Sequence, residues 1–386
     1  VDRLQRINDL LGYMVGDEVL QLLGQKCHEL VGVTFYRGQG GKFYCITTDL
    51  DRDKIEWIYQ QVKRFGEEVP REMKLEIQLT ISCGVAFFPQ DAEDFETLHA
   101  NVEYALEQAK KDGRGCIAQF SGKMHRRTVE QFQLQEVLRE AIANEFRGFS
   151  LVYQPLIRGE KQQVYGAETL MRFYLPDGSM VSPMEFIPIL EETGLIIPAG
   201  RWMMKEAMGK CSEIRKILSG FRMSINISQV QASKSDVIQD ISGEMKRAGL
   251  PLEALIVELT ESGLLEQNIN EKHFLTELKR MGISLALDDF GTGYSNFHYL
   301  SELKPEIIKI DRSFTAKAVA DKQEYYLLNQ FCTMIHNLDM RICIEGVENE
   351  QEWAMIRKLC PEFTQGYFWG KPCGYEEFMR KFTERK

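Results

Sequence analysis

Hydrophobic residues recur with two different spacings in the first part of this chain, which predicts a mixture of helices and strands. Helical spacing covers Asp17–Leu30 and a segment from about Phe95 to Lys111, where Asp112-Gly113 is a typical stop signal. Between these helices, β-branched and aromatic residues predict two pairs of strands. The pairs are Val33–Tyr36 with Phe43–Thr47, and a hairpin within Leu75–Phe88. Residues 1–120 are therefore predicted to form an α/β unit.

A second pattern follows a short polar and basic stretch, Ser121–Arg127, which is predicted to be a linker. A helix is expected at about Glu130–Asn144, and from Leu151 onward short β-branched runs recur, each followed by a helix-patterned segment. The runs are Leu151–Gln154, Val164–Leu170, Arg222–Ile227, Leu255–Leu259, Ser284–Asp288, Ile307–Ile310 and Arg341–Ile344. Strands that alternate with helices over about 235 residues predict a (β/α)8, or TIM-like, barrel. We therefore expect one domain over 1–122 and a second over 123–386.

Polar residues stand at or just beyond the end of nearly every run in this second region. Most are acids, joined by two amides and one lysine: Glu168, Asn226, Glu258, Glu261, Asp288, Asp289, Lys309, Glu345 and Gln365. The C-terminal ends of barrel strands converge on one face, where the active sites of such barrels lie. Residues far apart in the chain are therefore expected to meet in one pocket.

The chemistry of that pocket indicates divalent cations, because carboxylate and amide oxygens are the hard ligands that Mg²⁺ and Mn²⁺ prefer. So many carboxylates could not stay ionised together without cations, since repulsion and desolvation would raise their pKa values. Two cations that share Asp288 would remove this difficulty, activate a water and clamp a phosphodiester. Lys309 would then stabilise the nucleophile and the developing charge.

Each acid taken alone could equally be a helix cap or a loop residue at the end of a strand. For Glu168 by itself that simpler interpretation is favoured, whereas the repetition at successive strand ends favours a shared site. Asp288-Asp289, followed by the glycine-rich FGTGYSN, is the most specific single feature.

The stretch from about Gln131 to Phe382 resembles the EAL domain, a family of cyclic di-GMP phosphodiesterases. The motifs that carry the resemblance are YQPL, GAETLMRF, PMEFIPILEETGLI, INIS, ELTES, LDDFGTGYSNFHYL, KIDRSF, IEGVE and QGYFWGKP. They cover nearly the whole of the second domain. Three departures from the family pattern are Thr169, Asn296 and Ile344. None of them removes a ligand position, but Thr169 and Ile344 could alter how side chains pack behind the cations.

The resemblance implies two cation sites with a shared ligand, occupied by Mg²⁺ or Mn²⁺. The first site would be formed by Glu168, Asn226, Glu258 and Asp288, and the second by Asp288, Asp289 and Glu345. The positions matched to the catalytic water and to support of the DDFGTG loop are Lys309, Gln365 and Glu261. The substrate-binding positions would be Gln154, Leu170, Arg172 and Asp311, with Arg172 on a phosphate. A homodimer through this domain is a further expectation from the family.

The first region resembles a GGDEF domain, the family that makes cyclic di-GMP from two molecules of GTP. The resemblance rests on INDLLGYMVGD, ISCGVAFF and VEYALEQAKKDGRG, and it implies a mixed central sheet whose first strand would lie mostly before Val1. The signature falls on Gln39–Phe43, where Gly41 and Lys42 replace the two acids of the family. Without these carboxylates the cations cannot be held over a triphosphate. No cyclase activity is therefore expected.

Other nucleotide positions of that family survive in this chain. Asn8 and Asp17 match residues that read guanine, and Lys110 and Arg114 match residues that contact phosphate. Two interpretations stay open: weak GTP binding as a regulatory input, or a structural or dimer-forming relic.

Composition limits the partners of this protein. A formal net charge of −10 argues against binding to duplex nucleic acid. Nine cysteines without a C-x-x-C pair argue against structural zinc and a disulfide framework, and indicate reduced thiols in the cytoplasm. No apolar run approaches the roughly 18–20 residues of a membrane span. Any membrane or sensory region is expected to lie outside this chain.

The sequence thus favours a metal-dependent phosphodiesterase that opens cyclic di-GMP to linear pGpG. The alternative is a receptor that holds cyclic di-GMP without turnover and signals to a partner, and a third possibility is a scaffold. A pure receptor would not need Lys309 or Glu345, so their presence favours the enzyme.

Overall fold

The computed structural model describes residues 1–30, 33–47, 52–75, 77–159, 162–233, 236–260, 269–291 and 304–383, with the backbone alone at 52, 124, 125, 127, 128 and 269. It divides into two units, Val1–Phe132 and Gln133–Lys386. Helix α5 (Gly122–Ala143) belongs to both. The predicted linker at Ser121–Arg127 is therefore mostly helical, because no glycine or proline interrupts the segment after Gly122. The boundary expected after residue 122 stays a prediction.

The first unit is built from helices and two small sheets. Its elements before α5 are α1 (Leu4–Leu11), α2 (Tyr13–His28), β1 (Thr34–Arg37), β2 (Phe43–Ile46), α3 (Arg52–Glu72), β3 (Cys83–Val85), α4 (Phe95–Lys111) and β4 (Ile117–Gln119). β1 and β2 pair antiparallel around the glycine loop, and β3 and β4 pair parallel. In the described residues these strands form two separate sheets, whereas one mixed sheet is expected from the family.

The hairpin predicted within Leu75–Phe88 is wrong. Among the described residues of that segment only Cys83–Val85 forms a strand, and its partner is β4, far along the chain. Leu79 and Ile81 are buried because they pack against Phe65 and Val69 of α3. These residues are therefore apolar because they are buried against α3, and not because they belong to a paired strand.

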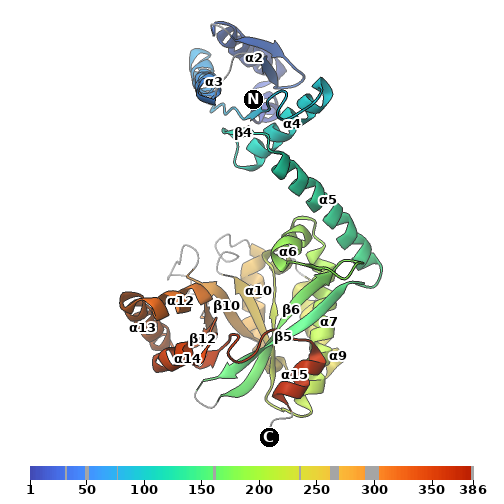
Figure 1. Ribbon diagram of the computed structural model, residues 1–386, viewed down its shortest axis with the longest axis vertical. Helices are drawn as coiled ribbons and strands as arrows, with labels where there is room; N and C mark the ends of the chain where they lie inside the picture. The colour runs from blue at the N-terminus through green and yellow to red at the C-terminus, as the bar shows by residue number, and fades with distance from the viewer. Residues whose placement is uncertain are drawn as a thin grey trace. The chain divides into compact units, whose positions relative to one another are not determined.

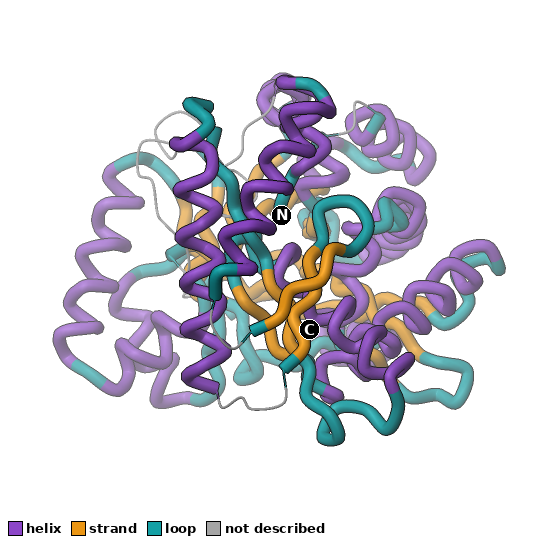
Figure 2. Tube along the Cα trace, turned by 90° about the horizontal axis from the view of Figure 1, so that it is seen from above, coloured by secondary structure: helices purple, strands orange, loops and turns teal. Residues whose placement is uncertain are grey.

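The second unit contains a closed barrel of eight strands with helices outside it, which confirms the predicted fold (Figures 1 and 2). The strands are β5 (Phe149–Arg158), β6 (Gln163–Tyr174), β8 (Arg222–Asn226), β9 (Leu255–Thr260), β10 (Ser284–Phe290), β11 (Ile307–Ile310), β12 (Arg341–Ile344) and β13 (Phe363–Thr364). Their order is β5-β13-β12-β11-β10-β9-β8-β6, closed by pairing of β5 with β6. A short strand, β7 (Met180–Val181), adds to the edge of β6.

The first barrel strand departs from the expected alternation. β5 is antiparallel to both of its neighbours, β6 and β13, and it joins β6 directly, so the prediction that a helix follows every run is wrong here. A parallel crossover needs a dozen or more residues, and the connection Gly159–Gln162 is too short for one. As a result Gln154 lies opposite Glu168 in the strand register.

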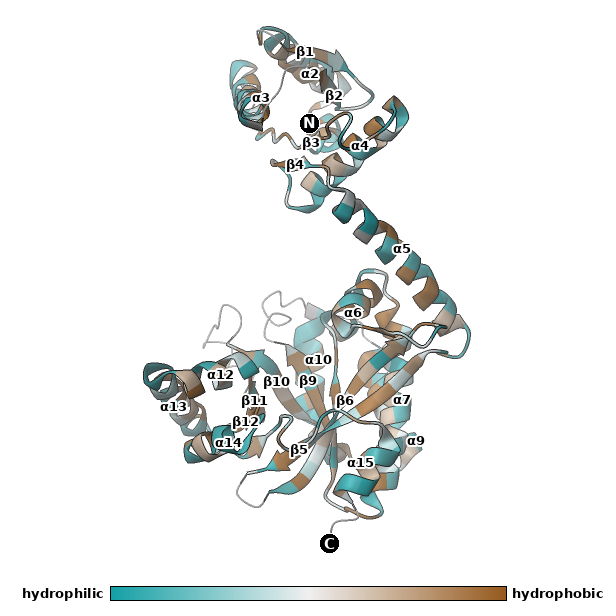
Figure 3. Ribbon diagram, in the orientation of Figure 1, coloured by the Kyte–Doolittle hydropathy of each residue, from teal (hydrophilic) through white to brown (hydrophobic). Residues whose placement is uncertain are grey.

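Helices cover the outside of the barrel. They are α6 (Pro183–Glu192), α7 (Ile196–Arg215), α8 (Gln229–Ala232), α9 (Val237–Ala248), α10 (Ile269–Met281), α12 (Arg312–Ala320), α13 (Lys322–Asn337), α14 (Glu350–Ile356) and α15 (Tyr375–Phe382), with single turns η1 (Leu252–Ala254) and η3 (Arg357–Leu359). In Figure 3 the strands carry many hydrophobic residues, whereas α15 presents a largely hydrophilic surface. None of the helices in the described parts of the chain is long and apolar enough to cross a membrane.

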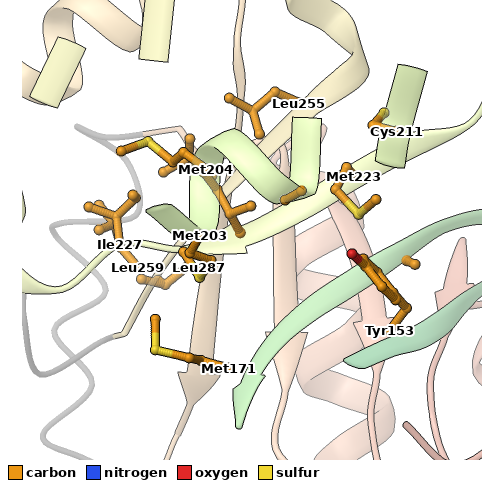
Figure 4. Close-up of a cluster of buried hydrophobic side chains, with 14 of the residues drawn as sticks. Tyr153, Met171, Met203, Met204, Cys211, Met223, Ile227, Leu255, Leu259 and Leu287 are labelled. Atoms are coloured by element: carbon orange, nitrogen blue, oxygen red, sulfur yellow. The ribbon is translucent and has the colours of Figure 1, made fainter. Parts of the chain in front are cut away.

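Alternate residues of each strand face the helices or the barrel interior, as the period of a strand requires. The outward set forms the main core, in which methionines of α7 such as Met203 and Met204 join Met223 and Leu255 of the strands (Figure 4). The inward set forms a smaller apolar layer of Leu156, Ile256, Ala286, Ile307, Cys343 and Phe363, beside Tyr165. The residues that follow on the same inward faces are therefore packed directly above this apolar layer.

Candidate active site

Polar side chains from the carboxyl ends of the strands lie together beyond this apolar layer. They come from β6 and from β8 to β13, in the order Glu168, Asn226, Glu258, Asp288, Lys309, Glu345 and Gln365. Glu168 and Gln365 are 197 positions apart in the chain, and yet the Gln365 Nε2 donates to the Glu168 Oε2 at 2.7 Å. The structure thus brings into one cluster the residues that the sequence places at successive strand ends.

Lys309 occupies the centre of the cluster and is 2% exposed. Its Nζ atom contacts four carboxylates at distances of 2.7–3.2 Å: Glu258 at 2.7 Å, Glu345 at 2.8 Å, Asp288 at 3.0 Å and Glu168 at 3.2 Å. Burial alone would lower the pKa of Lys309, but the surrounding carboxylates raise it well above its usual value. Lys309 is therefore a permanent cation that organises the acids around it.

Glu168 is the best-satisfied acid of the cluster. Its Oε1 accepts from the Asn226 Nδ2 at 2.9 Å, and its Oε2 accepts from Gln365 and Lys309. Burial raises the pKa of Glu168, but Lys309 and the two amide donors outweigh this and hold the pKa below its usual value. Glu168 is therefore ionised and fixed in orientation.

Two neighbouring acids are in the opposite situation. Burial, together with the charges of Glu168 and Asp288, raises the pKa of Glu258 well above its usual value. Burial in the first place, and then Asp288, raises the pKa of Glu345 to about 8. One lysine cannot compensate this many carboxylates, so the protein alone leaves an excess of negative charge in a buried place.

Asp288 and Asp289 are adjacent, and in a regular strand their side chains would point to opposite faces. The pairing of β10 with β11 shifts its register between Leu287 and Phe290, which marks a bulge at the two aspartates. Asp289 takes a left-handed backbone conformation with a φ of 52°, and its N–H donates to the Asp288 Oδ1 at 3.0 Å. The bulge allows carboxylate oxygens of Asp288, Asp289 and Glu345 to lie within 4.8 Å of one another.

The donor set fits two divalent cations. Oxygens of Glu168, Glu258 and Asp288 form one group within 4.8 Å, and those of Asp288, Asp289 and Glu345 form a second, so that Asp288 is common to both. The buried Oε1 of Gln365 has no hydrogen-bond partner among the described residues, which leaves an acceptor beside Glu168 for a further ligand of the site. Hard oxygen donors with this charge excess suit Mg²⁺ or Mn²⁺.

The residues predicted to bind substrate lie around this cluster, and they differ in the contacts that their side chains make. Leu170 and Arg172 follow Glu168 at alternate positions of β6, and Gln154 faces Glu168 across the β5–β6 pair. Arg172 is half-buried; burial lowers its pKa, and its Nη1 donates to the Met171 carbonyl at 2.8 Å. Asp311 caps α12, because its Oδ1 accepts from the Ser313 N–H at 2.9 Å.

Three residues mark the limits of sequence reasoning at this site. Glu261 and Asn296 lie outside the described residues. Ser224, by contrast, was not anticipated, although its hydroxyl donates to the Glu258 Oε1. The signal was present, since Ser224 lies two residues before Asn226 and therefore on the same face of β8.

The glycine loop of the first unit joins β1 and β2 in a hairpin, and Gly40 takes a φ of 62° that favours glycine. Lys42 forms an ion pair with Glu103 of α4, and the Tyr44 hydroxyl donates to the other oxygen of Glu103 at 2.8 Å. Burial raises the pKa of Glu103, but the bonds from Lys42 and Tyr44 outweigh it and lower the pKa. The Lys42 ammonium is therefore already paired with an acid of its own domain.

The surviving nucleotide positions of the first unit lie on α1, α2 and the end of α4. Asn8 folds against Gly16, and Asp17 is exposed on α2. Lys110 forms an ion pair with Glu107 at 2.7 Å, and Arg114 takes a left-handed φ of 65° after α4. Lys42 and Lys110 are therefore both already paired with acids.

Comparison with known families agrees with this architecture. The sequence model of the EAL domain matches residues 135–372, and that of the diguanylate cyclase GGDEF domain matches residues 1–116. The chain is 29% identical over 99% of its length to the cyclic di-GMP phosphodiesterase NbdA of Pseudomonas aeruginosa, covering 49% of that protein. It is 31% identical over 100% of its length to the signaling protein YkoW of Bacillus subtilis, covering 48% of it. The chain thus spans about half the length of these curated relatives.

Solved structures show the same fold. The PaMucR phosphodiesterase in complex with c-di-GMP superposes with a TM-score of 0.60 at 30% identity, covering 64% of this chain and 99% of that one. The EAL enzyme Bd1971 in its cAMP and cyclic-di-GMP bound form gives a TM-score of 0.63 at 25% identity, covering 75% of this chain and 76% of that one.

Proposed function

The chain belongs to the EAL domain family, with a GGDEF domain ahead of its EAL domain, and on this premise we propose that it is a metal-dependent phosphodiesterase that hydrolyses cyclic di-GMP to linear pGpG. The names of two relatives support this substrate: NbdA is a cyclic di-GMP phosphodiesterase, and the PaMucR phosphodiesterase was solved with c-di-GMP. The proposed location is the cytoplasm, because a reducing compartment keeps nine unpaired cysteines reduced.

The observation that carries the proposal is the excess of carboxylates around Lys309. One cation would be held by Glu168, Asn226, Glu258 and Asp288, and the other by Asp288, Asp289 and Glu345. Cations bound there supply a water of lowered pKa and neutralise charge on the phosphodiester. This arrangement would also allow Glu258 and Glu345, whose pKa values are raised, to be ionised as ligands.

Residues of the chain itself would position the reactants. Lys309 has a fixed positive charge among the carboxylates, so it would stabilise the attacking oxygen and the charge that develops on the phosphate. The Oε1 of Gln365, which has no partner in the described parts of the chain, would accept a hydrogen bond from that water. The Nη1 of Arg172 donates to a backbone carbonyl, and its other N–H groups would bind a phosphate oxygen.

The remaining predicted positions have supporting roles in this proposal. Gln154, Leu170 and Asp311 would line the substrate pocket beside the cations. Glu261 would secure the loop that follows Asp289.

The test is incubation of the protein with cyclic di-GMP and Mg²⁺ or Mn²⁺, with pGpG measured by chromatography. Glu168→Ala removes an ion-pair partner of Lys309 and a cation ligand, so turnover should be lost, whereas Glu185→Ala on the exposed start of α6 should leave it unchanged. Binding of cyclic di-GMP without any pGpG would refute the enzyme and establish the alternative, a non-hydrolysing receptor.

For the first domain we propose a regulatory or dimer-forming role without cyclase activity. Gly41 has no side-chain carboxylate to hold a cation, and Lys42 is paired with Glu103. Formation of cyclic di-GMP from GTP and Mg²⁺ would contradict this. Calorimetry distinguishes the two roles left open, because heat on addition of millimolar GTP would show that Asn8, Asp17, Lys110 and Arg114 still serve a nucleotide.

We also propose that the EAL domain forms a homodimer. Tyr326 and Leu327 on α13 are 62% and 61% exposed, which is unusual for large apolar side chains side by side. Light scattering on the intact chain and on Leu327→Glu would test this, since a monomer in both cases refutes it.

A further inference from the structure

Glu258 is held from two sides by side chains of neighbouring strands. Its Oε2 accepts from the Lys309 Nζ at 2.7 Å, and its Oε1 accepts from the hydroxyl of Ser224. Glu258 is 3% exposed and Ser224 is 1% exposed, so this contact is buried. Among the described contacts, Lys309 and Ser224 are the two donors that orient the carboxylate.

Ser224 reaches Glu258 because of the register of β8 and β9. Met223 and Ile225 face the outer core, which turns Ser224 and Asn226 toward the barrel interior. In the parallel pairing Asn226 is level with Glu258, and Ser224 is level with Ile256, one step below. The hydroxyl thus lies under the carboxylate, on the side away from the strand ends, with the Ile256 carbonyl as a second acceptor at 3.5 Å.

We propose that Ser224 is a positioning residue for the cation site, which orients Glu258 by donating to its Oε1. This inference rests on the cation site of the proposed function, and concerns the residue that supports the ligand. In this proposal Ser224 acts on a cation ligand, the Glu258 carboxylate, and is not itself one of the ligands. It holds one oxygen from below, so that the carboxylate keeps a single rotamer among Glu168, Asp288 and Lys309.

The size of the effect follows from the role of such supporting groups. Partners that orient a metal ligand commonly change metal affinity by about 10–100-fold when they are removed. Ser224→Ala leaves Lys309 as the only remaining donor to Glu258 among the described contacts, so the carboxylate can turn about its last torsion. We expect the lower part of that range, about tenfold weaker binding.

The barrel offers a matched control at its opposite end. Ser284 begins β10, is 4% exposed, and likewise donates to a carboxylate, the Oε2 of Glu306. Arg222 and Arg341 also bind Glu306, so this cluster forms a separate network. Ser284→Ala therefore removes a hydrogen bond from a buried serine to a carboxylate, here a partly exposed one, without touching Glu258.

The experiment measures Mn²⁺ binding to the intact chain by calorimetry, and thermal unfolding of each variant in EDTA. Ser224→Ala should weaken Mn²⁺ binding about tenfold, and Ser284→Ala should leave it unchanged. Ser224→Cys keeps a similar shape with a weaker donor, so its Mn²⁺ affinity should lie between those of the wild type and Ser224→Ala. This variant replaces Ser224→Ala in the test if the alanine variant does not fold.

Unchanged Mn²⁺ affinity in Ser224→Ala overturns the proposal. Equal weakening in both alanine variants also overturns it, because the loss would then follow from any buried serine. Neither result depends on hydrolysis, so a protein that binds Mn²⁺ normally but makes no pGpG would refute the proposed function and leave this test intact.

Discussion

Replacement of Lys309 by methionine is the sharpest perturbation of the site, because it deletes one buried charge that contacts four carboxylates. Methionine has a similar length and keeps the apolar part of the side chain. Glu168, Glu258, Asp288 and Glu345 would then face one another without a cation. Breaking a buried ion pair costs about 3–5 kcal/mol, and four partners place Lys309 at the upper end, about 5 kcal/mol.

This loss is measurable as a shift in thermal unfolding of the metal-free protein. For domains of about 150–250 residues, 1 kcal/mol corresponds to roughly 2–4 °C, so Lys309→Met should lower the unfolding temperature of the barrel in EDTA by roughly 10–20 °C. Addition of Mn²⁺ should recover much of the difference, since cations would compensate the same carboxylates. Hydrolysis of cyclic di-GMP should stay lost under both conditions.

The control is Lys381→Met, which breaks the exposed pair between Lys381 and Glu377 on α15. Such exposed pairs contribute little to stability, so the unfolding temperature should change by only roughly 1–2 °C. Unfolding of Lys309→Met in EDTA within that small range would show that Lys309 does not hold the cluster together, and would refute the electrostatic account of the site.

Three other predictions concern pH, packing and the first domain. In EDTA, the free energy of unfolding should fall as pH rises from about 4.5 through about 8, since the folded-state pKa of Glu345 is raised to about 8. Glu345→Gln should flatten this fall, and an unchanged slope in that variant would contradict the prediction. Thr169→Val should raise the free energy of unfolding by about 1 kcal/mol, because the buried Thr169 hydroxyl has no hydrogen-bond partner in the described residues; a loss in denaturant titration would refute this. Lys42→Glu should lower the free energy of unfolding by about 1 kcal/mol, and adding Glu103→Lys should restore it if their ion pair is the cause.

Much of the barrel could be predicted because its buried strands appear in the sequence as short apolar runs. Inward and outward residues alternate on β8, β9 and β10, and the acids appear where the apolar runs end. Asp288-Asp289 could be identified as a candidate for the same reason. The contacts of Ser224 could not be assigned, because a serine in a strand is compatible with either a structural or a supporting role until its partner across the sheet is known.

The direction of β5 and the bulge at Asp289 also depended on tertiary structure. Apolar runs do not show whether the next strand returns or crosses over. The structure extends β5 to Arg158 and begins β6 at Gln163, and the connection left between them is too short for a crossover. Likewise, two adjacent acids point to opposite faces in a regular strand, and the register shift against β11 is what brings oxygens of Asp288 and Asp289 within 4.8 Å of Glu345.

The sequence by itself determined which chemical groups this protein can bring to a site: acids, amides and one lysine at strand ends, and a glycine loop without acids in the first domain. Residue type and period are local properties, so they can be read along the chain. The tertiary structure decided which of these groups touch. It placed Lys309 among four carboxylates, Ser224 beneath Glu258, and Lys42 against Glu103. Those contacts depend on strand register and on helix placement, which are set by how distant segments pack together and not by any one segment alone.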